Sequence, residues 1–250
     1  MATKKGSTTD DKGSKSTALV QLKADLAKQA EEIGKKIQAP SGDKIRLTKD
    51  KKFVLPDGTK SEAGAVLSVV VLDFVAGTNF YDRPYSEDDP IPPACFALGE
   101  GNHKTLIPSE NAPDKQSDDC LSCPNNQFGS AGKGKACKNF YLLAVTQPDD
   151  DPESPVWLLK VSSTGLRSWD GHVGAVRAAF KTPPVGVVTD VWLDADSDFQ
   201  SLRFGNPVEN PNVALHNGRR AAALKRLLIE PDVSAYEAPK KVVRVAPKKK

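Results

Sequence analysis

The sequence predicts a mainly β fold of the α+β class, and three features of its 250 residues support this. Short runs rich in β-branched and aromatic residues recur along the chain, bounded by Pro, Gly and Asp, as is typical of strands and turns. The run AVLSVVVLDFVA at residues 65–76 is almost continuously apolar, as expected for a buried central strand. Three further segments show the apolar spacing of three and four residues that indicates helices.

The N-terminal region combines a polar arm with an amphipathic helix. Residues 1–15 are mostly Lys, Gly, Ser, Thr and Asp with almost nothing to bury, so we expect a disordered basic arm. The segment 16–40 predicts a helix, because Leu, Ala and Ile recur along residues 16–38 at spacings of three and four. We expect this narrow apolar stripe to dock on the body of the protein or on a second copy, giving a homo-oligomer.

Strands are predicted on both sides of the cysteine-containing segment. Residues 44–47 and 52–55 read as short strands, and Pro56-Asp57-Gly58 marks a turn after them. The strand at 65–76 follows, and residues 138–146 form another directly after the last cysteine. The cysteine segment is therefore an insertion of roughly fifty residues between two strands, and such an insertion needs a staple of its own to be ordered.

The second half of the chain continues with strands and one helix. Leu166, Trp169, Val173, Val176 and Phe180 fall on one helical face, which predicts a helix beginning after Ser163. The remaining predicted elements are a strand at 156–161, a strand at 185–193, a turn at 194–198 and a hairpin partner at 199–204.

The order of these elements within residues 44–210 predicts an OB-like small barrel with one inserted helix and a zinc loop at 95–137. A mixed sandwich with a similar number of strands fits the same pattern. Beyond the barrel, residues 211–230 predict an apolar-basic helix. The Pro- and Lys-rich residues 231–250 predict a disordered basic tail.

Positive charge is concentrated at the two ends of the chain. The net charge is only +3, but the first 52 residues carry thirteen Lys and Arg against seven acids, and the last 34 carry ten against three. Such ends predict arms that attract a polyanion, although lysine-rich tails that only maintain solubility would look the same. No apolar run of 18 residues and no signal-like N-terminus occur, so we expect a cytosolic protein.

All four cysteines of the chain lie in one window of 43 residues, and they predict a structural zinc site. A C-x2-C pair can hold two thiolates against one tetrahedral ion, and two more cysteines complete a closed site. The alternatives are one or two buried free thiols, or His103 in place of one cysteine. The expected Zn2+ ligands are Cys95, Cys120, Cys123 and Cys137.

Enzyme motifs are not matched. The segment 129–135 superficially resembles a phosphate-binding loop, but Ala136 replaces the required Ser or Thr and a strand follows instead of a helix. Neither H-x-E nor HExxH occurs, which argues against a catalytic zinc. The acidic cluster at 194–198 lacks the glycine and terminal glutamate of a calcium loop and predicts a hairpin turn. We therefore expect a non-enzymatic protein.

Aromatic and basic residues gather near the cysteines in the pattern of a single-strand nucleic-acid binder, which combines a basic groove with stacking platforms. Tyr hydroxyls prefer a wet edge, whereas Phe80, Phe140 and Trp157 are individually better explained as core. Phe140 and Tyr141 begin a strand, where alternation should send one inward and one outward. The candidate contacts are Arg46, Tyr81, Arg83, Tyr85, Phe128, Lys133, Lys135, Lys138 and Tyr141.

Between residues 44 and 205, six segments follow one another in order: VVVLDF, NFYDRPY, PPACFA, QSDDCLSCPNNQFGS, GKACKN and YLLAV. The most specific part is C-x-x-C-P-x-N-x-[FW]-G-S followed by G-K-A-C, matched from Cys120 to Cys137. In this arrangement the chain resembles a widespread set of bacteriophage proteins taken to be single-stranded DNA-binding proteins.

The resemblance implies an OB-like core that coats single-stranded DNA during phage DNA replication or recombination in the bacterial host cytoplasm. It also implies that the four cysteines hold zinc and that phage replication or recombination proteins are partners. One departure concerns the C-terminus: replication-type binders usually end in an acidic tail that recruits partners, whereas this chain ends in VVRVAPKKK.

Two other functions remain open on the sequence. A phage structural or scaffolding protein could use the zinc loop and the N-terminal helix for protein–protein contacts. A zinc-ribbon transcription regulator would instead select one duplex sequence.

Overall fold

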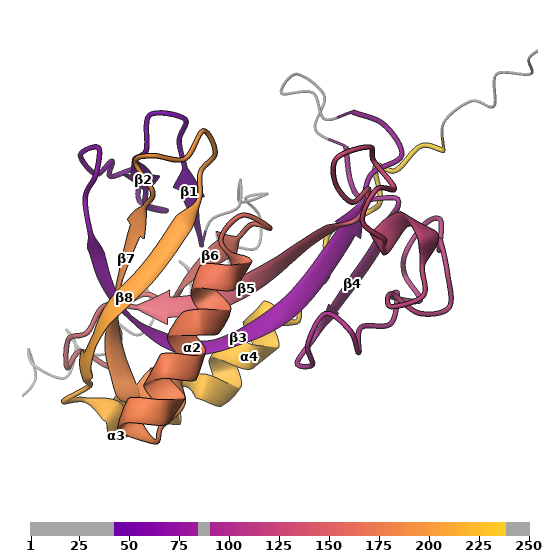
Figure 1. Cartoon of the computed structure of the whole chain (residues 1–250). Coiled ribbons are helices and arrows are strands. Elements are labelled where there is room, and N and C mark those ends of the chain that lie inside the picture. The colour runs from indigo at the N-terminus through magenta and orange to yellow at the C-terminus, as the bar shows by residue number, and fades with distance from the viewer. Residues whose placement is uncertain (1–42, 85–90, 239–250) are drawn as a thin grey trace, which may run out of the picture. The chain divides into compact units, whose positions relative to one another are not determined.

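The computed structural model describes residues 43–84 and 91–238 (Figure 1). The chain divides into two units, Met1–Gly42 and Asp43–Lys250, and every described residue belongs to the second. The expected N-terminal arm and helix, Tyr85 and the end of the basic tail lie outside the described residues.

The described part of the chain is mainly β, as predicted. Eight strands form one curled sheet, a half-barrel in outline, in the order β2-β1-β6-β5-β3-β7-β8, with β4 pairing to β3 off this path (Figure 1). The strands are β1 (Lys44–Leu47), β2 (Phe53–Val54), β3 (Leu67–Phe80), β4 (Cys95–Gly99), β5 (Lys138–Thr146), β6 (Trp157–Val161), β7 (Val187–Leu193) and β8 (Leu202–Glu209). The helices in the described residues are α2 (Leu166–Phe180), α3 (Val213–Gly218) and α4 (Arg220–Leu227), with short 3-10 turns η1 (Pro124–Asn126) and η2 (Pro184–Gly186).

Strand β3 is the shared member of the sheet. Along one edge it pairs antiparallel with β5, from Val70 to Asn79. Along its other edge its first residues pair with β7 and its last residues, Ala76 to Phe80, pair with β4. A continuous run of β-branched residues suits this role, because side chains on both faces of β3 are buried.

A β-bulge between Val71 and Asp73 changes which side chains of β3 face inward. Before it Val69 and Val71 belong to the inner core, and after it Phe74 packs against that core. Side chains alternate with a period of two, so one extra residue moves all later side chains to the opposite face. The inner core therefore contacts odd-numbered residues of β3 before the bulge and even-numbered residues after it.

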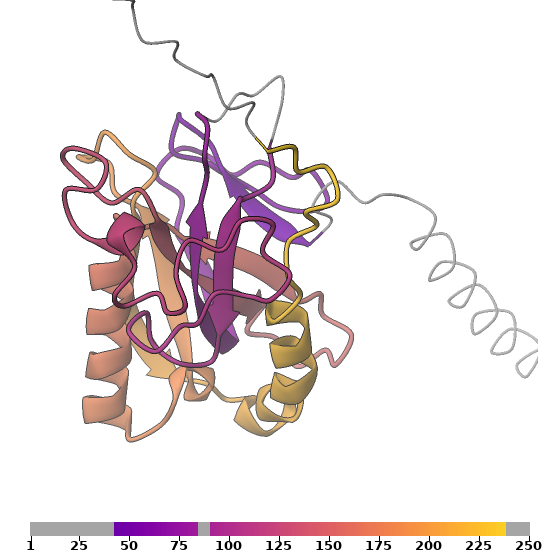
Figure 2. The same cartoon turned by 90° about the vertical axis from the view of Figure 1, so that its right-hand side faces the viewer.

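Two apolar cores lie on opposite faces of the sheet, and Figure 2 shows the sheet between α2 and the α3–α4 pair. The inner core includes Trp169 of α2, whose ring lies 5.1 Å from that of Phe74, centroid to centroid, in a T-shaped contact. The α4-side core joins Leu227 of α4 to the outward residues of β3. Arg220 of α4 also forms an ion pair of 2.9 Å with Asp73 at the bulge.

Most predicted elements agree with the structure. The strands predicted at 44–47 and 138–146 have the predicted bounds, and the predicted amphipathic helix forms α2. Strand β4 was not predicted, and the single helix expected at 211–230 forms as the two helices α3 and α4. In the described ranges, no helix has the length and apolar character needed to cross a membrane.

Gly77 of β3 provides a test of packing across the sheet. A Cβ at this position would lie 2.2 Å from Cζ of Phe140, whose strand pairs with Gly77. We expect Gly77→Ala to lower the free energy of unfolding by about 1–3 kcal/mol, because the Phe140 ring must move. Urea unfolding measures this, with Gly134→Ala as the control since nothing lies within 4 Å of its Cβ position. Equal stability of both variants would contradict this packing.

Buried histidines predict a dependence of stability on pH. Burial lowers the pKa of His172, whose Nε2 lies 3.0 Å from the Thr189 hydroxyl, and burial is also the main cause that lowers the pKa of His216. The unfolded chain binds protons at these residues below about pH 6.5, whereas the folded chain does not. The stability that these neutral histidines contribute above that pH should therefore decrease progressively as the pH falls below it. Urea unfolding at pH 7.5 and 5.5 measures the loss, and His172→Gln should reduce it because glutamine does not titrate.

Candidate nucleic-acid interface

The end of β3 brings together two segments that lie far apart in the sequence. Asn79 pairs with Lys138 at the start of β5, and Phe80 pairs with Cys95 at the start of β4. The residues that follow β3 are therefore adjacent to both the first and the last cysteine-containing segment. We call this place the β3 tip and define it by Asn79 to Arg83 and Lys138.

Tyr81 and Arg83 are both half-buried at the β3 tip. The Tyr81 hydroxyl accepts a hydrogen bond of 3.2 Å from Nδ2 of Asn79, which links it to the residue that pairs with Lys138. Arg83 lies beside Asp82, at 3.8 Å from Nε to the carboxylate, and its Nη2 donates to the carbonyl of Glu237 at 3.0 Å. One aromatic ring and one guanidinium are thus held at the end of the strand that pairs with both cysteine-containing segments.

Basic side chains of the cysteine loop approach the same tip through the start of β5. Lys138 is exposed, and its Nζ donates to the Lys135 carbonyl at 2.7 Å, which keeps the two residues together. Lys133 is exposed in the preceding turn. Through the pairing of Asn79 with Lys138, the structure therefore places Tyr81, Arg83 and Lys138 at the same end of the sheet.

Phe128 is the most exposed large apolar residue on this loop, with 80% of its surface accessible. It precedes a tight turn in which the Gly129 amide donates to the Gly134 carbonyl at 3.0 Å. The Ser130 hydroxyl donates to the carbonyls of Asn125 and Gln127, which fixes the backbone on either side of Phe128. An exposed ring on a well-bonded turn can serve as a stacking platform because its position is set before binding.

The C-x2-C segment is held by the amides that follow it. Nδ2 of Asn126 donates to the Cys120 carbonyl at 2.7 Å, and Nε2 of Gln127 donates to the Leu121 carbonyl at 2.7 Å. The Asn126 side chain is itself buried. Asn126, which the motif specifies, and Gln127, at one of its variable positions, therefore have a structural role that the sequence pattern alone did not reveal.

All four cysteines are buried and unpaired by disulfides. Burial is the main cause that raises the pKa of Cys120 to about 11 and that of Cys137 to about 12; the neighbouring thiolates, when charged, raise them further. Cys123 is a hydrogen-bond partner of Cys137, and burial also raises the pKa of Cys95. At Cys95, Cys120 and Cys137, negative charge is therefore unfavourable without a cation nearby.

Four buried thiols are the kind of ligand that a structural zinc requires. Their side chains, however, are not grouped closely enough to form a metal site in this structure. Within residues 43–84 and 91–238, no three His, Cys, Asp or Glu side chains are grouped so that they could hold a metal ion. Two of the thiols also serve as apolar residues: Cys120 packs in the inner core and Cys95 packs against Phe96 and Ala112. His103, the alternative ligand, lies 2.9 Å from the Phe140 carbonyl through Nε2.

The aromatic pair at the start of β5 does not alternate between core and surface. Tyr141 is buried in the inner core and its hydroxyl donates to Asp170 at 2.9 Å, so its ring is not available for stacking at the β3 tip. Burial and this hydrogen bond raise its pKa to about 12. Phe140 is also buried, since its ring packs where Gly77 leaves room for it.

A second group of basic residues lies on β6 and β1 and consists of Lys160, Lys44 and Arg46. The sequence pattern did not indicate Lys160 as a candidate. Nζ of Lys160 lies 4.3 Å from the centroid of the Phe140 ring, a cation–π distance. Burial and the nearby charge of Lys44 lower the pKa of Lys160. Arg46 lies on β1, which β6 separates from β5, so this candidate is not part of the β3 tip.

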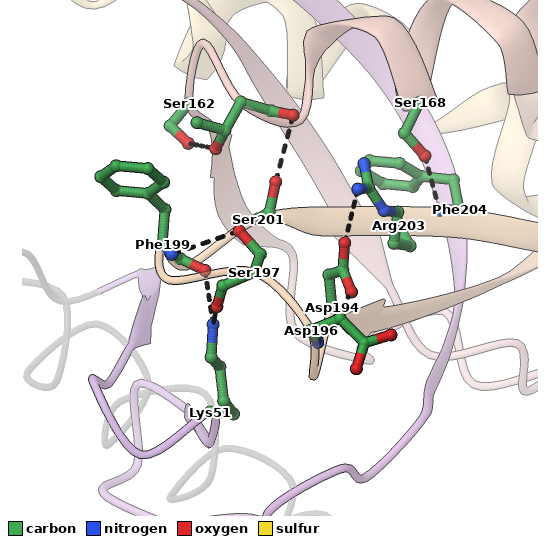
Figure 3. Close-up of polar contacts among 11 residues, drawn as sticks. Lys51, Ser162, Ser168, Asp194, Asp196, Ser197, Phe199, Ser201, Arg203 and Phe204 are labelled. Carbon is green, nitrogen blue, oxygen red and sulfur yellow. Dashed lines mark hydrogen bonds and ion pairs between the residues drawn. The ribbon is translucent and has the colours of Figure 1, made fainter.

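The turn between β7 and β8 presents another exposed ring, Phe199, with 65% of its surface accessible (Figure 3). Nζ of Lys51, from the turn between β1 and β2, donates to the carbonyls of Ser197 and Phe199 and so fixes this turn. Asp194 is paired with Arg203 on β8. Sequence reasoning identified the acidic turn as a hairpin but did not identify Phe199 as exposed, because burial of a single ring beside a turn has no local pattern in the sequence.

Comparisons with protein-family models, with curated proteins and with solved structures each found no match for this chain. The assignment of a function therefore depends on the geometry of the β3 tip and the cysteine loop.

Proposed function

We propose that this chain is a non-enzymatic, sequence-tolerant single-stranded DNA-binding protein that acts in phage DNA replication or recombination in the host cytoplasm. The observation that carries the proposal is the pairing of Asn79 with Lys138. This pairing joins the aromatic-basic segment after β3 to the lysines of the cysteine loop, although nearly sixty residues separate them in the sequence. The family resemblance of the motif points to the same function.

The connectivity of the sheet supports an OB-like barrel as the scaffold. Strands β3, β5 and β6 form an antiparallel meander, α2 follows, and the hairpin β7–β8 returns to pair with β3. In this interpretation the cysteine loop connects the first two barrel strands and the Phe199 turn connects the last two, which are the loops that bind oligonucleotides in OB folds. The barrel is half-open, because β6 pairs in parallel with β1 instead of with β8.

The proposed contacts divide into two kinds. Lys133, Lys135, Lys138 and Arg83 attract phosphates, which carry no sequence information. Phe128 and Tyr81 offer rings on which any base can stack, so binding tolerates many sequences. Tyr141 is excluded from this surface because its ring is buried.

We also propose that Cys95, Cys120, Cys123 and Cys137 bind a structural Zn2+. Burial keeps the thiols of Cys120 and Cys137 protonated, and a divalent cation would offset this by stabilising their thiolate forms. The ion would fix the loop that carries Phe128 and would take no part in chemistry.

One observation favours the alternative of a phage structural protein. The cysteine loop exposes three apolar side chains, Ile107, Leu121 and Phe128, of which 67%, 57% and 80% of the surface is accessible. Apolar side chains at a loop surface can form a protein–protein contact. DNA binding would require the ring of Phe128, whereas a protein contact would require the apolar surface of Leu121 as well.

The first test separates these functions. Phe128→Ala should weaken binding of an oligo-dT by about 1–3 kcal/mol in fluorescence anisotropy, because a stacking platform is removed. Leu121→Ala removes an exposed apolar side chain of the same loop that has no ring, so it should leave binding unchanged. Equal affinity of the wild type for single- and double-stranded DNA at low salt would rule out the proposed function. Light scattering that shows an oligomer dissociated by Leu121→Ala would favour the structural role.

The second test concerns the metal. Purified protein should contain about one zinc per chain, as expected for a closed four-thiolate site. Cys123→Ser should lower this ratio and increase the susceptibility of the loop to proteolysis. Ser122→Ala, at the neighbouring position, should retain the metal. A wild-type ratio near zero in metal analysis would show that the cysteines are buried free thiols.

A further inference from the structure

A cavity lies between α2 and the segment that follows β4, beside the inner core of the sheet. Its volume is about 270 Å³, near the lower end of the range of about 300–1,000 Å³ for ligand pockets, so it suits one small planar group. The side chains that give it its chemistry are three aromatic residues and three polar ones: Phe74, Tyr141, Trp169, Glu100, Asn102 and Asp170. Because Glu100 and Asn102 belong to the cysteine loop, the cavity joins that loop to α2.

Three aromatic side chains form the apolar walls of the cavity. The Phe74 ring makes T-shaped contacts with the rings of Tyr141 and Trp169, at centroid distances of 5.7 and 5.1 Å. Trp169 is fully buried on α2, and Tyr141 is buried near the start of β5. Because each ring is held by another, the walls need little reorganisation when a ligand binds.

Two carboxylates of the cavity have acceptors that the described residues leave unused. Oδ1 of Asp170 accepts from the Tyr141 hydroxyl at 2.9 Å, which fixes the carboxylate, whereas its Oδ2 has no hydrogen bond to a described residue. Glu100 is exposed and forms no hydrogen bond or ion pair within residues 43–84 and 91–238. Together these oxygens can accept hydrogen bonds from N–H groups of a ligand.

The cavity also has two donors to offer. Nε1 of Trp169 is buried and has no acceptor among the described residues. Nδ2 of Asn102 has none there either, since only Oδ1 of this side chain is engaged, by the Lys104 amide at 2.9 Å. A buried N–H without an acceptor is unfavourable, so a ligand that carries an acceptor would be stabilised here.

Aromatic walls, free acceptors and free donors together indicate the class of ligand. A nucleobase is planar and carries both acceptors and N–H donors on its edge, so it can use all three features. A guanidinium or ammonium group would suit the rings and the carboxylates but has no acceptor for Trp169 or Asn102. A phosphate would be repelled by Glu100 and Asp170.

Cationic groups lie close to the cavity. The ring of His103 lies 4.6 Å from that of Tyr141, centroid to centroid. Burial is the main cause that lowers the pKa of His103, and the charges of Asp170 and Lys135 act on this pKa in opposite directions. Lys138 of the β3 tip is three residues before Tyr141 on β5, about 10 Å along the strand. Lysines of the cysteine loop are thus near enough to attract the backbone of a strand whose base occupies the cavity.

We propose that this cavity binds one nucleobase of the single strand and favours a base with an exocyclic amino group, namely cytosine, adenine or guanine, over thymine. The proposal rests on the proposed function and adds a base-binding subsite to it. Cytosine presents the N4 amino group where thymine presents the O4 acceptor, which carboxylates would repel. One such subsite leaves the other contacts of a long strand tolerant of sequence.

Oligo-dC and oligo-dT of equal length are the probes, because the two pyrimidines differ in the group that a carboxylate would contact. At neutral pH and equal salt, the wild type should bind oligo-dC about two- to tenfold more tightly in fluorescence anisotropy, as expected for one additional hydrogen bond. The ratio of the two affinities is the quantity to compare among variants.

Three variants remove one negative charge each, so their general affinity for DNA should change alike and only the ratio reports on the cavity. Asp170→Asn keeps an acceptor for the Tyr141 hydroxyl but removes the carboxylate, so the ratio should approach one. Glu100→Gln should also lower it. Asp150→Asn, at an exposed side chain in the turn between β5 and β6, is the matched control and should leave the ratio unchanged.

Mononucleotides test the cavity without a bound strand. Deoxycytidine monophosphate should shift the amide resonances of Gly101 and Asn102 and the indole N–H resonance of Trp169 more than thymidine monophosphate does at the same concentration. These shifts should be smaller in Asp170→Asn. Circular dichroism verifies that this variant keeps the fold of the wild type.

The outcomes distinguish this inference from the proposed function. If the wild type prefers single strands but binds oligo-dC and oligo-dT equally, or if Asp170→Asn leaves the ratio unchanged, the inference is wrong and the function stands. If the mononucleotide shifts depend on Asp170 but single strands are not preferred over duplex, the subsite stands and the function fails. Shifts caused by arginine methyl ester and not by deoxycytidine monophosphate would assign the cavity to a cationic side chain and overturn the inference. Binding of neither nucleotides nor oligonucleotides rejects both.

Discussion

The antiparallel pairing of β3 with β5 positions most other features of the described structure. It continues from Val70 to Asn79, through a bulge that keeps both halves of β3 in contact with the same inner core. Because the pairing extends to the last residues of β3, the cysteine loop must start and finish beside that end. A shorter ladder would leave Tyr81 and Lys138 without a common location, since side-chain register is transmitted along strands by their hydrogen bonds.

The cysteine loop has few elements of regular structure and is ordered by three other kinds of contact. Side-chain amides of Asn126 and Gln127 bind carbonyls around the C-x2-C segment. Cys120 and Cys95 fill apolar positions in two clusters. Residues that follow α4 add the third kind of contact: Glu230 accepts hydrogen bonds from Ser109 and Asn111, and Val233 packs against the cluster that contains Cys95. A bound cation would stabilise the loop further, because it would favour the thiolate form of cysteines that burial keeps protonated.

At the β3 tip, some charged residues are engaged by contacts within the protein and others remain accessible to solvent. Asp82 is held by Tyr236 and lies beside Arg83, so one local acid is engaged within the protein. The lysines of the loop remain exposed or half-exposed. Such an arrangement retains local positive charge at low desolvation cost.

Local signals in the sequence were enough to predict the mainly β class, most strands and α2. β-branched runs, helical spacing and the C-x2-C pattern are each confined to short stretches of chain, so they can be recognised without the fold. The pairing of β4 with β3, the burial of Tyr141 and the presentation of Phe199 by Lys51 became evident only in three dimensions. The same is true of Val233 and Tyr236, which lie against the cysteine loop and the β3 tip. These features depend on a bulge, on register and on contacts between distant residues, and short-range periodicity contains no information about any of them.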